Sequence, residues 1–165
     1  MFQKVLTNLV SFILPIAVLY LVPDWLTGFI PVKLTALVYP GILFLLTGVI
    51  MLALTVIAFI RKGNGTLAPW SPTKKLVITG LHAYTRNPMI SGVAITLGGE
   101  ALILYSLKIL TWLIIFIVIN HFYFVLFEEP SLYDRFGNAY LDYKKHVGRW
   151  IPRIHPYQPD KNTTA

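Results

Sequence analysis

The sequence predicts an all-α integral membrane protein with about four transmembrane helices and a C-terminal amphipathic helix at the cytoplasmic interface. Hydrophobic residues make up 56% of the chain and charged residues 13%, against about 45–50% and about 25% in an average soluble protein. The charges also cluster between long apolar runs. Four runs are long enough, or nearly so, to cross ~30 Å of hydrocarbon as helices: residues 5–22, 36–60, 89–107 and 109–127.

The first two runs are interpreted as a scaffold of two transmembrane helices. Pro15 predicts a kink in the first run, because proline lacks a backbone donor. A secretory signal peptide is the alternative, but Lys4 is the only charge near this run and no small-residue cleavage site follows it, so we expect a retained helix. In the second run Gly41, Gly48 and Thr55 recur every seven residues. They predict a groove of small residues against which a neighbouring helix packs closely.

The distribution of positive charge predicts the orientation in the membrane. All but Lys33 and Lys108 of the 14 Lys and Arg residues fall on one side of the predicted helices. The positive-inside rule then places both termini and the loop 61–88 in the cytoplasm, at a bacterial or archaeal inner membrane or at the endoplasmic reticulum of a eukaryote. The net charge of +7 is explained by anionic headgroups, so we expect no nucleic-acid partner.

Metal and thiol chemistry are not expected. The chain has no cysteine, which excludes disulfides, thiolate nucleophiles and Cys-ligated metals. The four histidines, His82, His121, His146 and His155, lack the spacing of a zinc site.

A helix start follows the long cytoplasmic loop. Asn87 is a good N-cap and Pro88 a good first helical residue. The unpaired amides of this helix start and the adjacent Arg86 predict a seat for an anion such as a carboxylate. Within the helix, Gly92 and Gly99 repeat the small-residue pattern of the second run.

The third and fourth runs predict a tight antiparallel hairpin, because little more than Lys108 separates them. Glu100 lies about 18 Å from the start of the third helix, at 1.5 Å per residue. A carboxylate at this depth must be protonated, paired or in a polar cavity. Asn120 and His121 are its nearest expected partners, and the trio fits a structural clamp or a catalytic relay equally well.

Two glutamates end the fourth run. Glu128 and Glu129 lie where an anionic leaflet disfavours acidic side chains, which favours a functional role. His121 precedes Glu128 by seven residues, so both are expected on one face of the helix, with the imidazole below the carboxylate.

After Pro130 apolar residues recur at helical spacing and predict an amphipathic helix along the cytoplasmic interface. The polar tail, residues 158–165, is predicted to be flexible. The recurring apolar residues are Leu132, Phe136, Tyr140, Tyr143 and Val147.

These motifs, in this order and spacing, resemble the superfamily of isoprenylcysteine carboxyl methyltransferases and phospholipid N-methyltransferases. The resemblance covers about the C-terminal two thirds of the chain. It is carried by Thr66-Leu67-Ala68-Pro69, Leu76-Val77-Ile78-Thr79-Gly80, Tyr84, Arg86-Asn87-Pro88-Met89, Glu128-Glu129-Pro130, Phe136-Gly137, Tyr140, Tyr143 and Val147.

The resemblance implies a membrane methyltransferase that uses S-adenosyl-L-methionine and lacks a Rossmann fold, and no GxGxxG follows a predicted strand here. It implies a lipophilic acceptor from the bilayer, such as a phospholipid amine or an isoprenoid. Residues 1–60 would be the scaffold and residues 61–157 the catalytic region. It also implies that Glu128 and Glu129 are the acidic pair of the active site. The chemistry of the residues adds Arg86, which could hold the cofactor carboxylate, and His121, which like Glu128 could act as a base, as candidate catalytic residues. The implied cofactor-contacting residues are Lys74, Leu76, Val77, His82, Tyr84, Asn87, Pro88, Met89, Ile90 and again Glu128 and Glu129.

Two positions depart from the pattern. An arginine that the prenylcysteine enzymes carry one turn before the acidic pair is Phe124 here, and a tyrosine common near the cofactor is His82. The first departure removes the expected partner of a prenylcysteine carboxylate.

Two other classes of protein are alternatives to a membrane methyltransferase. An NADPH-dependent membrane reductase of the sterol-reductase type would need basic residues for the cofactor phosphates, and Lys74, Lys75 and Arg86 are few for that purpose. A non-enzymatic membrane scaffold would leave the polar residues at both ends of the hairpin unexplained.

Overall fold

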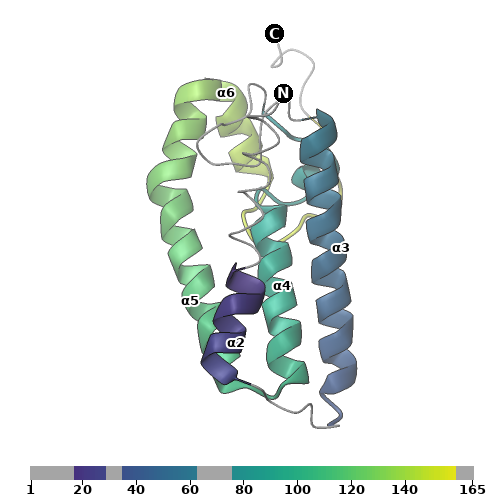
Figure 1. Ribbon diagram of the computed structural model, residues 1–165. Coiled ribbons are helices and arrows are strands. Elements are labelled where there is room, and N and C mark those ends of the chain that lie inside the picture. Colours follow the sequence, from purple (N-terminus) through teal and green to yellow (C-terminus); the bar gives the residue numbers. More distant parts are fainter. Residues whose placement is uncertain (1–16, 29–34, 63–75, 159–165) are drawn as a thin grey trace, which may run out of the picture.

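The computed structural model describes residues 17–28, 35–62 and 76–158, and every regular element in these segments is helical. The long helices lie side by side along one direction (Figure 1). Two stretches are long and apolar enough to cross a membrane, Val38–Ala58 and the apolar part of Leu107–His146. The all-α expectation is confirmed for the described residues, and two of the four expected spans meet the length that a membrane requires.

Helix α3 (Val38–Lys62) has 25 residues and therefore extends about 37 Å at 1.5 Å per residue. Its bounds agree with the predicted run 36–60. Large apolar side chains such as Leu43 and Ile50 are exposed on it. An apolar exposed surface on a helix of this length is what a lipid environment requires.

Helix α4 (Pro88–Ile103) begins where the sequence predicted but has only 16 residues, about 24 Å. It ends early because the chain turns at Tyr105, whose φ is 48°. The Ser106 side chain then accepts a bond from Ile109 N and caps the next helix. The turn of the hairpin therefore precedes Lys108, which lies in the first turn of α5 (Leu107–Tyr123).

Helices α3 and α4 interlock through their small residues, as the spacing predicted. A Cβ at Gly48 would lie 2.6 Å from Thr96 N, and a Cβ at Gly99 would lie 2.6 Å from Leu45 N. Thr55 is completely buried. The backbones approach so closely that no larger side chain fits between them.

The fourth run continues into the C-terminal helix without a break. Helix α5 passes through a π-helical turn, η3 (Phe124–Glu128), into α6 (Glu129–His146). At Gly137, with φ 52° and ψ −129°, α6 changes direction, and Figure 1 shows it bending over at the end of the molecule. A positive φ of this kind is costly for any residue but glycine.

The helix expected after Pro130 is thus present but extends the membrane helix, and its apolar face packs on the protein. Tyr140, Tyr143, Val147 and Tyr157 form a buried cluster, with Leu132 and Phe136 packed against it. A second cluster joins α4 to α5 and contains Val93, Leu97, Ala101, Ile109 and Phe116.

Near the N-terminus, a π turn η1 (Ala17–Leu21) leads into α2 (Val22–Thr27). This segment packs on α5, where Trp112 Nε1 donates to Val18 O at 3.2 Å and Lys108 Nζ donates to Leu26 O at 2.9 Å. Most of the predicted first helix, including Pro15, lies outside the described residues.

Candidate functional site

Three distant segments meet at one end of the helices: the loop before α4, the junction of η3 with α6, and residues 147–157, which we call the C-terminal strap. The strap pairs with the loop. Thr85 Oγ1 donates to Arg149 O at 2.8 Å, and Tyr143 OH donates to His82 O at 2.7 Å. Because α4 starts directly after this loop, the strap fixes the entry to α4. The backbone bonds are Arg86 N to Gly148 O, Arg153 N to Tyr84 O and Tyr157 N to Ala83 O, each 2.9 Å.

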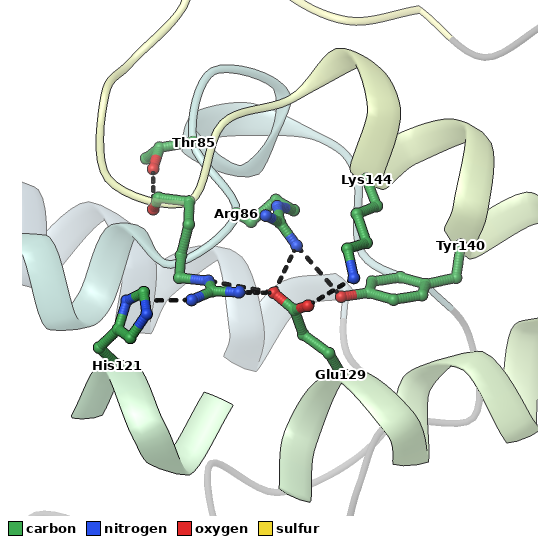
Figure 2. Close-up of polar contacts among 7 residues, drawn as sticks. Thr85, Arg86, His121, Glu129, Tyr140 and Lys144 are labelled. Carbon is green, nitrogen blue, oxygen red and sulfur yellow. Dashed lines mark hydrogen bonds and ion pairs between the residues drawn. The ribbon is translucent and has the colours of Figure 1, made fainter. Parts of the chain in front are cut away.

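Glu129 is the centre of the site. Its Oε1 lies 2.7 Å from Arg86 Nη1, and its Oε2 lies 2.7 Å from Lys144 Nζ. Arg149 binds the same Oε1 through Nη2, and through Nε at 3.0 Å. Figure 2 shows the Glu129 carboxylate pointing toward Arg86 and Lys144. The side chain of Glu129 is 9% exposed and those of both arginines are 12% exposed, so these are shielded ion pairs.

Two shielded arginines share Glu129 with Lys144, whose side chain is 44% exposed, so positive charge exceeds negative charge around the buried carboxylate. Such an excess is costly unless an anion or water compensates it. Arg86 also donates to Tyr140 OH at 3.2 Å. Within the described residues, the Nε of Arg86 is buried and has no hydrogen-bond partner. An anion seat at Arg86 therefore stays a prediction, and Glu129 occupies one face of that guanidinium.

His121 joins the site through Arg149. Its Nδ1 lies 3.2 Å from Arg149 Nη1. A guanidinium only donates hydrogen bonds, so we assign the acceptor lone pair to Nδ1 and the ring proton of the neutral imidazole to Nε2. His121 then offers an N–H donor to a ligand.

The predicted alignment of His121 with Glu128 is wrong. The π turn η3 lies between them, and a residue in a π turn advances less around the helix axis than a residue in an α turn. The residue that returns to the His121 face is therefore Glu129, and Arg149 bridges the two. Glu128 is half-buried.

The trio expected around Glu100 is also not formed. Glu100 lines a pocket with Asp24 and Thr27 at the opposite end of the hairpin. Asn120 Nδ2 donates within its own helix, to Phe116 O at 2.8 Å. The prediction failed because the turn at Tyr105 places Glu100 near the start of α5, whereas His121 lies near the end of α5.

The structure describes most, but not all, of the loop residues that the family resemblance matched to cofactor contacts. Lys74 lies outside the described residues. Leu76 packs on the Tyr140 cluster, and Val77 and Tyr84 are half-buried. His82 is 7% exposed, and burial lowers its pKa to about 4, so its imidazole is neutral at pH 7.

The residues matched to the helix start are in the first turn of α4. Asn87 occupies the N-cap position, but its side chain makes no capping bond. Its backbone oxygen accepts from Ser91 N at 3.0 Å instead. Pro88 is buried, and Met89 and Ile90 are half-buried. The side-chain amide of Asn87 therefore does not cap α4, although the sequence predicted that it would.

Arg149 and Lys144 are the site residues that sequence reasoning missed. Both were counted only as positive charge near headgroups. The sequence does contain an indication that this region returns to the site. Gly148 and Pro152 mark a turn after α6 that brings the chain back to the helices.

Helices that are long and apolar enough to cross a membrane, with a charged cluster at one end, are typical of the class of integral membrane proteins. Within that class, the sequence model of the family described as phospholipid methyltransferase matches residues 36–139. The chain belongs to this family, a family of methyltransferases, which confirms the resemblance. No curated protein and no solved structure matches the chain. The matched range contains Arg86, His121, Glu128 and Glu129 but ends before Lys144 and Arg149.

Proposed function

We propose that this chain transfers a methyl group from S-adenosyl-L-methionine to a lipophilic acceptor at the cytoplasmic membrane interface. The observation that carries the proposal is the cluster of Arg86, Lys144 and Arg149 around Glu129 at the end of apolar helices. A cofactor that carries a carboxylate, an ammonium and a sulfonium needs cationic and anionic groups close together. Membership in the phospholipid methyltransferase family supports a phospholipid acceptor.

The described residues fit this cofactor. The unpartnered Nε of Arg86 and the start of α4 suit its carboxylate. Glu128, which has no ion-pair partner within 4.0 Å among the described residues, suits its ammonium or ribose hydroxyls. The loop side chains Leu76, Val77, His82 and Tyr84, with Asn87, Pro88, Met89 and Ile90 at the helix start, would form the rest of the seat, and Lys74 is proposed from the sequence alone.

When bound, the cofactor supplies an electrophilic methyl group, which the acceptor takes up while the sulfur leaves as a thioether. The protein contributes by aligning the acceptor with the methyl group and by excluding water. A protonated amine must first lose a proton. We assign this step to Glu128 as general base. His121, with Nδ1 engaged by Arg149, acts as an Nε2–H donor that orients the acceptor.

Thermal unfolding in detergent tests the cofactor. We expect S-adenosyl-L-methionine and S-adenosylhomocysteine to raise the unfolding temperature and NADPH to leave it unchanged. Stabilisation by NADPH alone would instead support the reductase, and stabilisation by none of the three would support a scaffold. Lipids labelled from a methyl-deuterated cofactor and identified by mass spectrometry then reveal the acceptor.

The orientation is part of the proposal. Because most Lys and Arg residues flank the site end of the helices, both termini would lie in the cytoplasm. Reporter fusions at each terminus test this placement, and an extracytoplasmic signal from either fusion would contradict it.

A further inference from the structure

The C-terminal strap is anchored at both ends and exposes two isoleucines between them. Val147 is 1% exposed and Tyr157 is 9% exposed. Ile151 and Ile154 are 82% and 90% exposed, the highest values among the large hydrophobic side chains of the described residues. The strap's backbone bonds to the loop before α4 hold this arrangement in place. Such exposure in a fixed segment marks a contact surface.

The strap touches the membrane helix within its apolar part. The ring of Trp150 lies 6.1 Å from the ring of Phe124, edge to face. Phe124 is one turn before the acidic pair, and the neighbouring Leu126 and Phe127 are 60% and 65% exposed. The strap with its exposed isoleucines is therefore held against the same apolar segment that exposes Leu126 and Phe127. Tryptophan is the residue typical of the boundary between hydrocarbon and headgroups.

Basic residues accompany the two isoleucines along the chain. His155 follows Ile154 in the strap and is exposed, and Lys145 is exposed at the end of α6, two residues before the strap begins. An apolar tip beside exposed basic groups complements an anionic lipid surface. A second copy of the chain fits less well, because two side chains separated by Pro152 and Arg153 are far from the ~800 Å² that each partner of a stable complex buries.

We propose that the strap is a membrane anchor, with Ile151 and Ile154 inserted among the acyl chains below the headgroups at the site end of the helices. The same strap carries Arg149, so lipid contact holds Arg149 against Glu129 and His121. This proposal depends on membrane insertion and not on the chemistry of methyl transfer.

The absence of cysteine makes the test direct. Ile151→Cys and Ile154→Cys would each be spin-labelled in vesicles of phosphatidylcholine and phosphatidylglycerol. Asn138→Cys, at an exposed position directly after the α6 bend, is the matched control. Collision with oxygen, which concentrates in hydrocarbon, is compared with collision with a water-soluble nickel chelate. We expect an oxygen-to-nickel ratio several-fold higher at 151 and 154 than at 138.

Ratios at 151 and 154 equal to the ratio at 138 would overturn the proposal. So would spin–spin broadening at 151 that disappears on dilution with unlabelled protein, because it would place a second copy on the strap. Circular dichroism confirms that each labelled variant is folded. If the label at 151 disturbs Trp150, position 154 decides alone. The experiment uses no methyl-transfer assay. A result that contradicts the membrane anchor is therefore separate from a result that contradicts the proposed function.

Discussion

The α3–α4 pair and the site end of the molecule are held together by opposite means. Between α3 and α4, glycines bring two backbones into direct contact. At the site, ion pairs to the buried carboxylate of Glu129 join segments that are far apart in the sequence. The α3–α4 contact depends on the shape of two closely packed helices, so an added side-chain atom destabilises it. The site depends on the balance of charges around Glu129, so the loss of one ion-pair partner destabilises it. The following predictions test this difference, beginning with the largest expected effect.

Glu129→Ala should have the largest effect on stability. It leaves Arg86 and Arg149 shielded without their common anion, and it removes the partner of the more exposed Lys144. The loss of the anion from a shielded place costs about 3–5 kcal/mol in the free energy of unfolding. Denaturant titration in detergent measures the loss. Asp134→Ala, at an exposed position of α6, is the control and should change little. Equal stability of Glu129→Ala and the wild type would mean that charge does not hold this end together.

Glu128→Gln should reduce methyl transfer by about a hundredfold, the lower range for loss of a general base, while the unfolding temperature stays near that of the wild type. Initial rates with a radiolabelled cofactor measure the effect. Wild-type turnover would remove Glu128 from the mechanism, whereas unfolding of this variant would mean that Glu128 is structural like Glu129.

Gly99→Ala should destabilise the α3–α4 pair by about 1–3 kcal/mol, because the added methyl group overpacks a closed contact. It would lie 2.6 Å from Leu45 N. Gly98→Ala is the matched control, since its Cβ would find no atom nearer than Phe44 at 3.7 Å. Comparable stability of the two variants would show that the helices separate easily and that shape is not decisive.

Arg149→Lys should cost about 1 kcal/mol, the net value of a hydrogen bond, because a lysine keeps the charge beside Glu129 but cannot also reach His121. A double-mutant cycle with His121→Ala isolates this contact. A coupling free energy of zero would mean that Arg149 does not position His121.

The smallest predicted effect is a pH dependence at His82. Burial lowers the pKa of His82 to about 4, below its usual value of 6.5, so the unfolded chain binds a proton that the folded chain does not. Stability is therefore lost as the pH falls below 6.5, by about 1 kcal/mol between pH 7 and pH 5.5. Thermal unfolding of the ligand-free protein, compared with His82→Gln, measures it. An identical pH dependence in the variant would assign the loss to other groups.

The α3–α4 contact, which depends on shape, could be predicted from the sequence. The spacing of Gly41, Gly48 and Thr55 is a local periodicity, and the structure places these residues at the predicted contact. The start of α4 at Pro88 follows from proline chemistry in the same way. The division of the chain after residue 60 into scaffold and catalytic region stays a prediction.

The charge cluster around Glu129 could be predicted from the sequence only in part. Arg86 and Glu129 were singled out, but Arg149 was not, because its role depends on a strap that returns from the end of the chain. The π turn was missed because its residues, Phe124–Glu128, have the composition of an ordinary membrane helix. One extra residue in that turn decides which glutamate faces His121.

The strap also determines when the site can exist during synthesis. Arg86 and Glu129 leave the ribosome before Lys144 and Arg149, which complete the charge cluster around Glu129. The apolar helices can insert and pack beforehand, since their contacts need nothing from the C-terminus. A nascent chain released before the strap would have its apolar helices but an unfinished charge cluster, so the cluster around Glu129 is completed only after Arg149 has been synthesised.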